Sequence, residues 1–297
     1  MPQVAVNGVE LFYEVAGDGD PLVLVHGSWG DHHNWVPALA ALTRDHRVLV
    51  YDRRGHSRSE RPPGQGTRRE DEDDLAALME TLGFAPAFVA GNSFGASTAL
   101  GLATRRPELF RGIVAHEPPL MGIVADDPEA RPLMAATGRL MASVVDRLRA
   151  GETVAGARQF VDEVAFGPGE WERMPERVRE TFRANAPTFA DEQDDPEWAE
   201  LDLGRLSGFP GPALLTQGSE SPPWFARIVG RLGGALPRAA TYTFEGAGHV
   251  PHVTHPAEYA RQVAALVAEG RRAPSESGRG SRGERAARAV HAFRGGL

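Results

Sequence analysis

The segment whose residue types could do chemistry is Gly91-Asn92-Ser93-Phe94-Gly95, in which a serine stands between two glycines. An apolar run over residues 87–90 precedes it, and a run of small residues over 96–105 follows it. This order predicts a strand, a tight turn and a helix, with the serine hydroxyl at the sheet edge and at the positive end of the helix. Ser93 is therefore a candidate nucleophile, and the alternative is a turn that merely contains glycine.

The composition narrows the chemistry further. The chain has 297 residues, a formal net charge of −8 and a pI near 5.7, which argues against a nucleic-acid or anionic-membrane partner. It contains neither cysteine nor lysine, which excludes disulfides, thiolate metal sites, cysteine nucleophiles and Schiff-base chemistry. We find no signal-peptide pattern and no apolar run near the ~20 residues of a membrane span. We expect a soluble cytoplasmic protein that acts on a small molecule.

Short apolar segments alternate with helical ones along most of the chain. The strands that we expect cover residues 4–6, 9–15, 21–25, 47–51, 87–90, 112–116, 213–216 and 239–244. Asn7-Gly8 predicts a two-residue hairpin between the first two strands, so the chain opens antiparallel. The later alternation with helices predicts a parallel α/β sheet.

One helical segment begins with the acidic run at residues 70–74, which follows Thr67. Such a run could bind a cation. Acidic side chains are also stabilised at the start of a helix by the backbone dipole. We favour the second interpretation, a helix start whose acids are solvated.

Residues 120–206 interrupt the alternation of strands and helices. Helical segments are expected there at residues 132–150, 154–165 and 172–185, with no strand between them. The insertion carries more apolar bulk than exposed helices need, in Met121, Met134, Met141, Phe166, Trp171, Phe182, Phe189 and Trp198. Part of this surface should face the sheet, with a ligand pocket between the two.

These patterns predict four parts of the chain. Residues 1–119 and 207–270 form the core, and residues 120–206 form an inserted helical segment, which the family resemblance described below identifies as a lid. From residue 271 the composition shifts to Arg, Gly, Ser and Pro, which predicts a disordered basic tail over 271–297. A nucleic-acid-binding tail is the alternative for that last part.

Separated motifs follow the predicted strands in one order. They are His26-Gly27-Ser28-Trp29, residues 52–57 (Asp-Arg-Arg-Gly-His-Ser), the turn at Ser93, and residues 246–249 (Gly-Ala-Gly-His). With these motifs the chain resembles the α/β-hydrolase family from about residue 4 to residue 269. The resemblance implies a mostly parallel eight-stranded sheet flanked by helices, with a helical lid inserted after the sixth strand.

A serine hydroxyl is a weak nucleophile until a base takes its proton, and His249, on the loop after the last strand, is the candidate base. His249, His252 and His255 are spaced by three residues, which could suggest a metal site. Pro251 and Pro256 break a regular helix there, and no carboxylate motif accompanies the histidines. We therefore expect neither a metal nor another cofactor.

The oxyanion formed when Ser93 attacks a carbonyl needs backbone N–H donors, each worth about 3 kcal/mol in the transition state. The family places these donors at the residue after the nucleophile and in the loop after the third strand. By resemblance they are Phe94 and Ser28. His26, at the start of the same loop, is interpreted as structural rather than catalytic.

The acid that supports the base is where the chain departs from the commonest family pattern. Family members usually carry an aspartate three residues after the glycine that ends the seventh strand, and counting from Gly218 this position is Ser221. A serine cannot offset an imidazolium charge. Two acids could serve instead, Glu220 beside the expected place and Glu117 at the end of the sixth strand. We favour Glu117, which resembles the glutamate of a branch of the haloalkane dehalogenases.

The type of nucleophile limits which reactions of the family this chain could catalyse. Haloalkane dehalogenases and epoxide hydrolases of the family attack with aspartate, so Ser93 disfavours both. We expect a serine hydrolase that cleaves a small or medium apolar carboxylic ester, lactone or thioester through an acyl-serine intermediate, with Ser93, His249 and Glu117 as its triad. The alternatives are a carbon–carbon bond hydrolase, a lyase, cyclase or cofactor-free tailoring enzyme on the same fold, and a non-catalytic ligand receptor. A monomer or a homodimer is expected.

Overall fold

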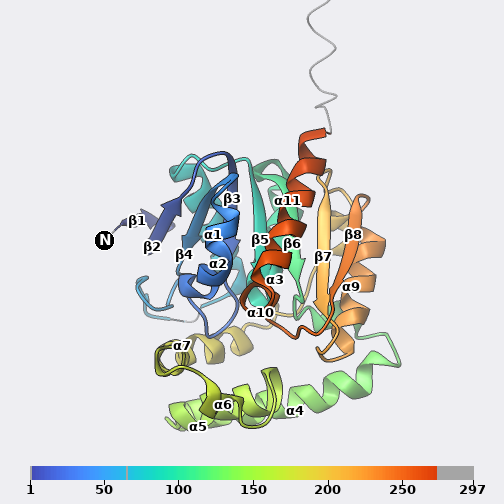
Figure 1. Cartoon of the computed structure of the whole chain (residues 1–297). Coiled ribbons are helices and arrows are strands. Elements are labelled where there is room, and N and C mark those ends of the chain that lie inside the picture. Colours follow the sequence, from blue (N-terminus) through green and yellow to red (C-terminus); the bar gives the residue numbers. More distant parts are fainter. Residues whose placement is uncertain (1, 65, 273–297) are drawn as a thin grey trace, which may run out of the picture.

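A computed structural model describes residues 2–64 and 66–272, in which eight strands form one sheet (Figure 1). The strands are β1 (Gln3–Val6), β2 (Val9–Ala16), β3 (Asp20–Val25), β4 (His46–Tyr51), β5 (Ala87–Asn92), β6 (Phe110–His116), β7 (Ala213–Gly218) and β8 (Ala239–Phe244). Their spatial order is β1-β2-β4-β3-β5-β6-β7-β8. Strand β2 pairs antiparallel with β1 and β4, and all other neighbours are parallel. The predicted mostly parallel eight-stranded α/β sheet is confirmed.

Local sequence explains both kinds of pairing. Asn7 and Gly8 have φ of 47° and 76°, as a two-residue turn between antiparallel strands requires, and they bring Val6 opposite Val9. The central strands are instead apolar along their length, and every residue of β5 is buried. Parallel strands covered on both faces need such continuous apolar runs.

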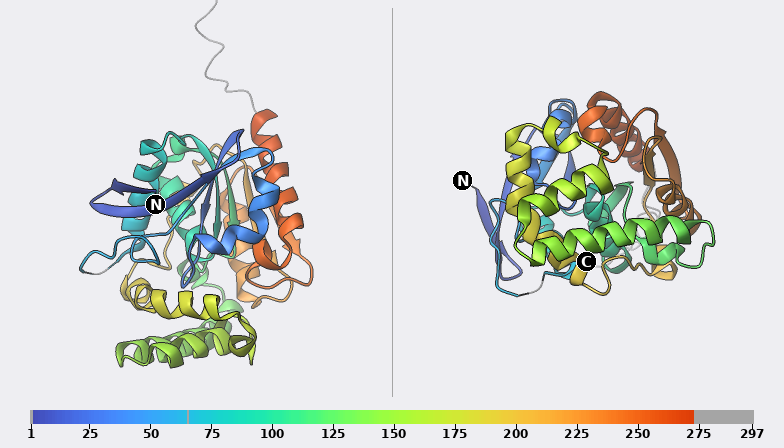
Figure 2. Two further views of the ribbon diagram at one scale, coloured as in Figure 1. Left: turned by 60° about the vertical axis from the view of Figure 1, so that its left-hand side comes forward. Right: turned by 90° about the horizontal axis from the view of Figure 1, so that it is seen from below.

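Helices cover both faces of the sheet (Figure 2). On one face, α2 (Arg68–Thr81), α3 (Phe94–Arg105) and α9 (Trp224–Ala235) share a buried cluster with the strands. On the other face lie α1 (Val36–Leu42) and α11 (Pro256–Arg272). The short helices η1 (His32–Trp35), η2 (Pro107–Leu109) and α10 (Pro251–Thr254) belong to the connections. The carboxyl ends of the parallel strands meet at one edge, where open α/β sheets bind their ligands.

Only helices occur between β6 and β7 in this described part of the chain. They are η3 (Met121–Val124), α4 (Ala130–Arg149), α5 (Thr153–Gln159), η4 (Phe160–Ala165), α6 (Glu170–Arg173), α7 (Glu176–Asp194) and α8 (Leu203–Leu206). We call residues 130–194, from α4 to α7, the helical layer. It lies below the sheet in Figure 1, and the right-hand view of Figure 2 looks onto it.

The predicted helices of this region need one correction. A single helix over residues 172–185 was wrong, because the chain turns extended at Met174 (ψ 138°) before Pro175. A residue before proline is disfavoured in the helical conformation. Helix α6 therefore ends at Arg173, and α7 begins at Glu176 and continues to Asp194.

The acidic run lies at the start of α2, which Thr67 caps as a helix start requires, but the prediction that its acids are solvated was wrong. Asp71, Glu72 and Asp74 are only 5%, 3% and 1% exposed. They pair with arginines from other segments, Asp71 with Arg53, Glu72 with Arg105 and Asp74 with Arg54. Because these arginines are distant in sequence, the residues around the acidic run do not show that it is paired and buried. The run is part of a buried ion-pair network.

The end of the described chain differs slightly from expectation. Helix α11 extends to Arg272, two residues into the predicted tail. The remainder of that tail, residues 273–297, lies outside the described residues. Among the described residues, no helix is both long enough and apolar enough to span a membrane. The division into core and lid stays a prediction.

Candidate active site

Ser93 occupies the turn between β5 and α3. Its φ of 55° and ψ of −125° form a conformation that residues with a side chain rarely adopt. The Ser93 N–H donates to the carbonyl of His116 at 2.9 Å, and the Ser93 carbonyl accepts from Ala96 in the first turn of α3. These bonds hold a strained residue at the carboxyl end of a central strand, as functional sites often do.

Glycine is required on both sides of Ser93 by close approach of the backbone. A Cβ on Gly95 would lie 2.3 Å from the Val25 carbonyl oxygen, and one on Gly91 would lie 2.6 Å from backbone atoms of Ala96. A Cβ on Gly27, in the loop after β3, would lie 2.9 Å from the Cβ of Ser93. The glycines thus allow α3 and the loop after β3 to close around the serine.

Glu117 and His249 come together although 132 residues separate them. Their side chains join at Nδ1 of His249 and Oε2 of Glu117, 2.6 Å apart, and the Gly218 N–H donates to Oε1 of Glu117 at 2.7 Å. The amide of Asn92, next to Ser93, donates to the His249 carbonyl at 2.9 Å. A carboxylate can only accept, so in the neutral imidazole of His249 the proton is on Nδ1 and Nε2 is left as an acceptor.

The electrostatics favour a charged Glu117. Burial by itself raises the pKa of this carboxyl, but the hydrogen bonds from His249 and Gly218 and the nearby histidines lower that pKa to about 2. Burial lowers the pKa of His116 to about 4, so His116 is neutral at pH 7. Its Nδ1 lies 2.9 Å from the hydroxyl of Thr216. The hydrogen bonds and the nearby histidines therefore keep Glu117 ionised at neutral pH despite its burial.

Glu220, the other candidate acid, is exposed on the loop after β7, where its backbone N–H donates to the Ala247 carbonyl. The neighbouring Ser221 has a buried hydroxyl with no hydrogen-bond partner among the described residues. Of the two glutamates, the structure brings Glu117 to His249.

The predicted oxyanion-hole residues lie on either side of the serine. Phe94 is the first residue of α3, Ser28 lies on the loop after β3, and both line the same pocket as Ser93. Trp29, which follows Ser28, has a φ of 65°. Trp29, Ser93 and Glu117 are three of the five non-glycine residues with positive φ in the described ranges, so backbone strain gathers around this pocket.

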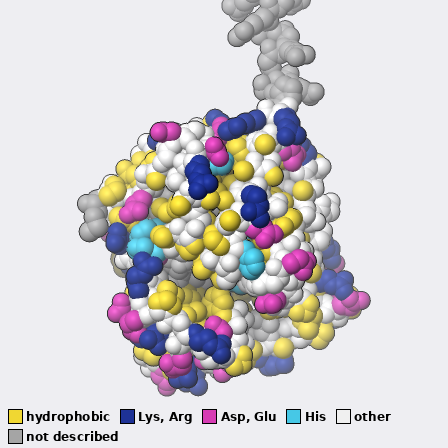
Figure 3. Space-filling model, in the orientation of Figure 1, with side chains coloured by type: hydrophobic (Ala, Val, Ile, Leu, Met, Phe, Trp, Pro, Cys, Tyr) yellow, Lys and Arg dark blue, Asp and Glu magenta, His cyan; other side chains and the backbone are white. Residues whose placement is uncertain are grey.

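The pocket lies between the sheet edge and the helical layer and contains about 580 Å³ of empty space, part of it open to solvent. Figure 3 shows a hollow between these two parts of the molecule, with hydrophobic side chains at it. Its walls are aromatic and aliphatic, with Met141, Phe160 and Phe189 from the helical layer and Trp224 and Phe225 from α9. No aspartate, glutamate or arginine is among its described lining residues. The pocket walls are mostly apolar, and their described residues carry no carboxylate or guanidinium group.

His26 and His252 have structural surroundings. His26 accepts a hydrogen bond from the Arg53 N–H at its Nε2, 3.0 Å away, which agrees with the structural interpretation. His252 is buried, with its ring 4.4 Å from Trp35 and 5.9 Å from Tyr259. Among the described residues, His249, His252 and His255 do not form a metal-ligand group.

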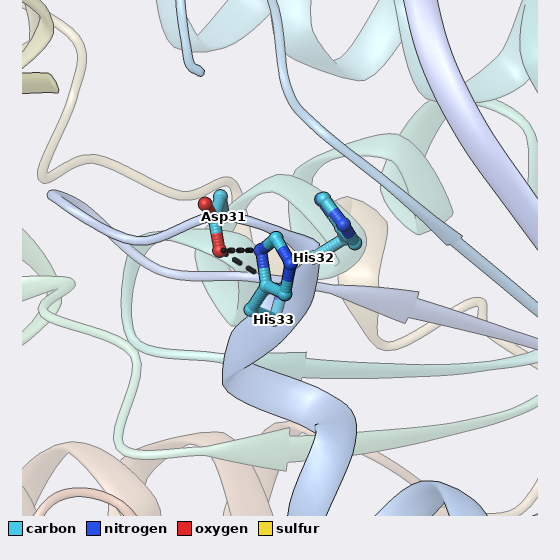
Figure 4. A group of neighbouring side chains, drawn as sticks. All are labelled: Asp31, His32 and His33. Carbon is cyan, nitrogen blue, oxygen red and sulfur yellow. Dashed lines mark hydrogen bonds and ion pairs between the residues drawn. The ribbon is translucent and has the colours of Figure 1, made fainter. Parts of the chain in front are cut away.

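Asp31, His32 and His33 offer ligand-type atoms within 4.8 Å of one another (Figure 4). Hydrogen bonds already use them: Asp31 Oδ1 accepts from the His33 N–H at 2.9 Å, and His32 Nδ1 lies 2.6 Å from Asp52 Oδ1. The Ser57 hydroxyl donates to the other oxygen of Asp31. We attribute this group to the start of η1, which Asp31 caps.

Sequence reasoning missed Glu192, whose carboxylate on α7 accepts from the Ser28 hydroxyl at 2.5 Å and from Arg53 at 2.7 Å. The sequence did hold a signal for this contact: Asn185, Thr188 and Glu192 are polar residues spaced by three and four positions, which places them on one face of a helix. All three are buried at the contact between α7 and the core.

Comparison with known proteins gives a family match over most of the chain. The sequence profile described as the Alpha/beta hydrolase family matches residues 22–262. The chain is 27% identical to the 2-hydroxymuconate semialdehyde hydrolase of Pseudomonas sp. (strain CF600) over 275 residues, 90% of this chain and 93% of that protein. It is 37% identical to the uncharacterized hydrolase YraK of Bacillus subtilis (strain 168) over 121 residues, 40% of this chain. That match spans only 45% of the Bacillus protein's length.

Solved structures share the fold. The enol-lactonase from Burkholderia xenovorans LB400 superposes with a TM-score of 0.75 at 25% identity, over 90% of this chain and 100% of the lactonase. A thermophilic esterase from Thermogutta terrifontis has a TM-score of 0.69 at 22% identity, over 91% of this chain and 99% of the esterase, and shares the fold.

Proposed function

Because the chain belongs to the Alpha/beta hydrolase family, we propose that it is a serine hydrolase that cleaves apolar carboxylic esters, lactones or thioesters. The observation that carries this proposal is the 2.6 Å contact between His249 and Glu117 beside a strained serine in an apolar pocket. Nucleophile, base and acid are the three parts that acyl transfer through a serine requires.

In the first half of the reaction, Ser93 Oγ attacks the substrate carbonyl while Nε2 of His249 takes its proton. Glu117 keeps the proton of the imidazole on Nδ1 and stabilises the imidazolium that forms. The backbone N–H groups of Phe94 and Ser28 donate to the oxyanion. The tetrahedral intermediate then collapses, His249 gives its proton to the departing alkoxide or thiolate, and acyl-Ser93 remains.

In the second half, water replaces the leaving group. His249 takes a proton from this water as it attacks the acyl carbonyl, and the oxyanion returns to the same two donors. Collapse releases the carboxylic acid and restores Ser93 Oγ with the proton from His249. With a lactone, the alcohol and the acid are parts of one product.

The pocket supports a neutral, apolar substrate. A charged group placed among Met141, Phe160 and Trp224 would lose its water without gaining an ionic partner, which is costly. In this proposal residues 120–206, which include the helical layer, form the lid over the acyl-binding space. Similarity to an enol-lactonase supports cyclic esters as members of the substrate class.

Carbon–carbon bond hydrolysis is the second candidate, because the chain aligns along 90% of its length with a 2-hydroxymuconate semialdehyde hydrolase. That relative's name denotes a carboxylic acid substrate. The described lining residues here hold no arginine to pair with a carboxylate, so we rank this activity below ester hydrolysis.

The test is turnover of 4-nitrophenyl butyrate, phenyl thiobutyrate and a neutral aryl lactone, together with labelling of Ser93 by a fluorophosphonate. We expect ester turnover, labelling located at Ser93, and loss of both in Ser93→Ala. A folded protein that leaves Ser93 unlabelled would refute the serine-hydrolase proposal and favour a ligand receptor. Labelling without turnover of any ester, but with turnover of a ring-cleavage product, would favour the carbon–carbon hydrolase.

A further inference from the structure

A buried carboxylate on the helical layer, that of Glu192, connects this layer to two loops, the one that carries Ser28 and the one that carries Arg53. Glu192, on α7, is 5% exposed, and its two carboxylate oxygens accept separately from Ser28 Oγ at 2.5 Å and from an Nη of Arg53 at 2.7 Å. Burial raises the pKa of Glu192, whereas the charge of Arg53 and the Ser28 hydroxyl oppose that rise. The carboxylate therefore depends on both partners, since a buried charge is costly unless it is paired and hydrogen-bonded.

Arg53, the cation that pairs with Glu192, also contacts the side chain of Phe94, whose backbone N–H is the other proposed oxyanion donor. Its guanidinium lies 4.5 Å from the centroid of the Phe94 ring, and its side chain is 99% removed from solvent. Asp71 of α2 accepts from the same guanidinium at 2.7 Å and so anchors it to the core. Glu192 thus contacts Ser28 directly, and it contacts Phe94 through Arg53.

The same face of α7 holds the rest of the loop after β3. The Asn185 amide donates to the Gly30 carbonyl at 2.8 Å, and its oxygen accepts from the Ser57 N–H at 2.8 Å. Thr188 lies 3.0 Å from Nε2 of His56. Positions 185, 188 and 192 fall on one side of a helix, so α7 presents a polar row to the loops after β3 and β4.

Trp29 couples this loop to the apolar interior of the helical layer. Its ring lies 4.7 Å from Phe189 and 4.9 Å from Phe160, between ring centroids. Within the described chain it is the one buried member of that cluster that comes from outside the helical layer. Its backbone is strained, at φ 65°, and such a conformation persists only when its surroundings hold it.

We propose that Glu192 is a positioning residue for the oxyanion hole: through Ser28 and Arg53 it holds the two donor segments in place, so the hole is complete only while α7 is docked. This inference rests on the proposed serine-hydrolase function. It makes the helical layer part of the catalytic geometry as well as a cover for the pocket. Substrate entry that moves α7 would switch the site off until α7 returns.

The test uses variants that cut the Glu192 contacts and measures kcat, KM and amide exchange. Glu192→Met keeps the length and helix preference of the side chain but cannot accept from Ser28 or Arg53. Ser28→Ala removes one hydroxyl and leaves the backbone donor. Because a misplacement near 1 Å can cost about 100-fold, we expect Glu192→Met to lower kcat for 4-nitrophenyl butyrate by about 10- to 100-fold, with KM changed by less than about threefold. Ser28→Ala should lower kcat by less.

The double variant separates positioning from a general loss of structure. Glu192→Met should cost less in the Ser28→Ala background than in the wild type, because the two substitutions remove one shared bond. The matched control is Asp191→Asn, since Asp191 is the next residue along α7 and pairs with Arg61 at the surface. This control should leave kcat unchanged. Equal costs of Glu192→Met in both backgrounds, or an effect on KM alone, would overturn the proposal.

Hydrogen exchange provides a readout that needs no activity. The backbone amides of residues 27–30 should exchange faster in Glu192→Met and Ser28→Ala than in the wild type, and at the wild-type rate in Asp191→Asn. Unchanged exchange in both Glu192→Met and Ser28→Ala would refute the positioning role. If Glu192→Met failed to fold, unchanged exchange in Ser28→Ala would by itself refute this role. If fluorophosphonate does not label Ser93 in the wild type, the serine-hydrolase proposal fails. Hydrogen exchange at residues 27–30 would still show whether Glu192 of α7 holds the loop after β3.

Discussion

Replacement of Glu117 by glutamine is the sharpest test of the proposed triad, because the substitution keeps the size of the side chain and changes only its hydrogen bonding. Glu117 is fully buried and accepts two hydrogen bonds, from the Gly218 N–H at 2.7 Å and from His249 Nδ1 at 2.6 Å. A glutamine has a single acceptor oxygen and an NH₂ group that can only donate. One of the two bonds must therefore change.

The backbone decides which one changes. The Gly218 N–H is always a donor, so the glutamine oxygen must face Gly218 and the NH₂ group must face His249. Nδ1 then has to accept, the imidazole proton moves to Nε2, and His249 can no longer take the proton of Ser93. Loss of the correct tautomer in a serine protease lowers kcat by about 10⁴-fold, which corresponds to about 5 kcal/mol of transition-state stabilisation.

We expect Glu117→Gln to lower kcat for 4-nitrophenyl butyrate by 10³- to 10⁴-fold, with KM nearly unchanged, in initial-rate assays at pH 7.5. The matched control is Glu220→Gln, because Glu220 is exposed and its described contact with the Ala247 carbonyl uses only its backbone. Circular dichroism and thermal unfolding should show that both variants fold. If Glu220→Gln lost several orders of magnitude in rate while Glu117→Gln kept its activity, the tautomer argument would be wrong.

Two further predictions concern stability. Burial lowers the pKa of His26 and His116 to about 4, so between pH 6.5 and 4 the unfolded chain binds protons that the folded chain does not. Lowering the pH from 7 to 5 should therefore decrease the free energy of unfolding in urea, by on the order of 2 kcal/mol for each histidine. Glu117, with its pKa lowered to about 2, adds to the loss of stability only below about pH 4.5. Equal free energies of unfolding at pH 7 and pH 5 would contradict the argument from the histidines. Gly95→Ala should lower Tm and destabilise the fold by about 1–3 kcal/mol, because its Cβ would lie 2.3 Å from the Val25 carbonyl oxygen. The control is Gly230→Ala in α9, where a Cβ meets open space and should not destabilise the fold. Thermal unfolding of both variants is the measurement.

Local patterns were sufficient for the sheet and for the nucleophile turn. The Asn7-Gly8 hairpin, the apolar runs of the central strands and the Gly-x-Ser-x-Gly turn are each encoded within a few consecutive residues. Each can therefore be predicted without knowing where the rest of the chain lies. Proline explains the break between α6 and α7 that the prediction missed, since a residue before Pro175 is disfavoured in the helical conformation, whereas the continuation of α7 to Asp194 had no such local signal.

The acid and the support of the oxyanion hole depend on contacts between distant segments. Glu117 and Glu220 were both reasonable partners for His249 from their places after neighbouring strands, and the directions in which two loops leave the sheet bring Glu117 into contact. The contact between Ser28 and Glu192 joins residues 164 positions apart. Neither periodicity nor turn chemistry reports on such pairs, because both describe a residue's relation to its chain neighbours and not to the loops that folding places beside it.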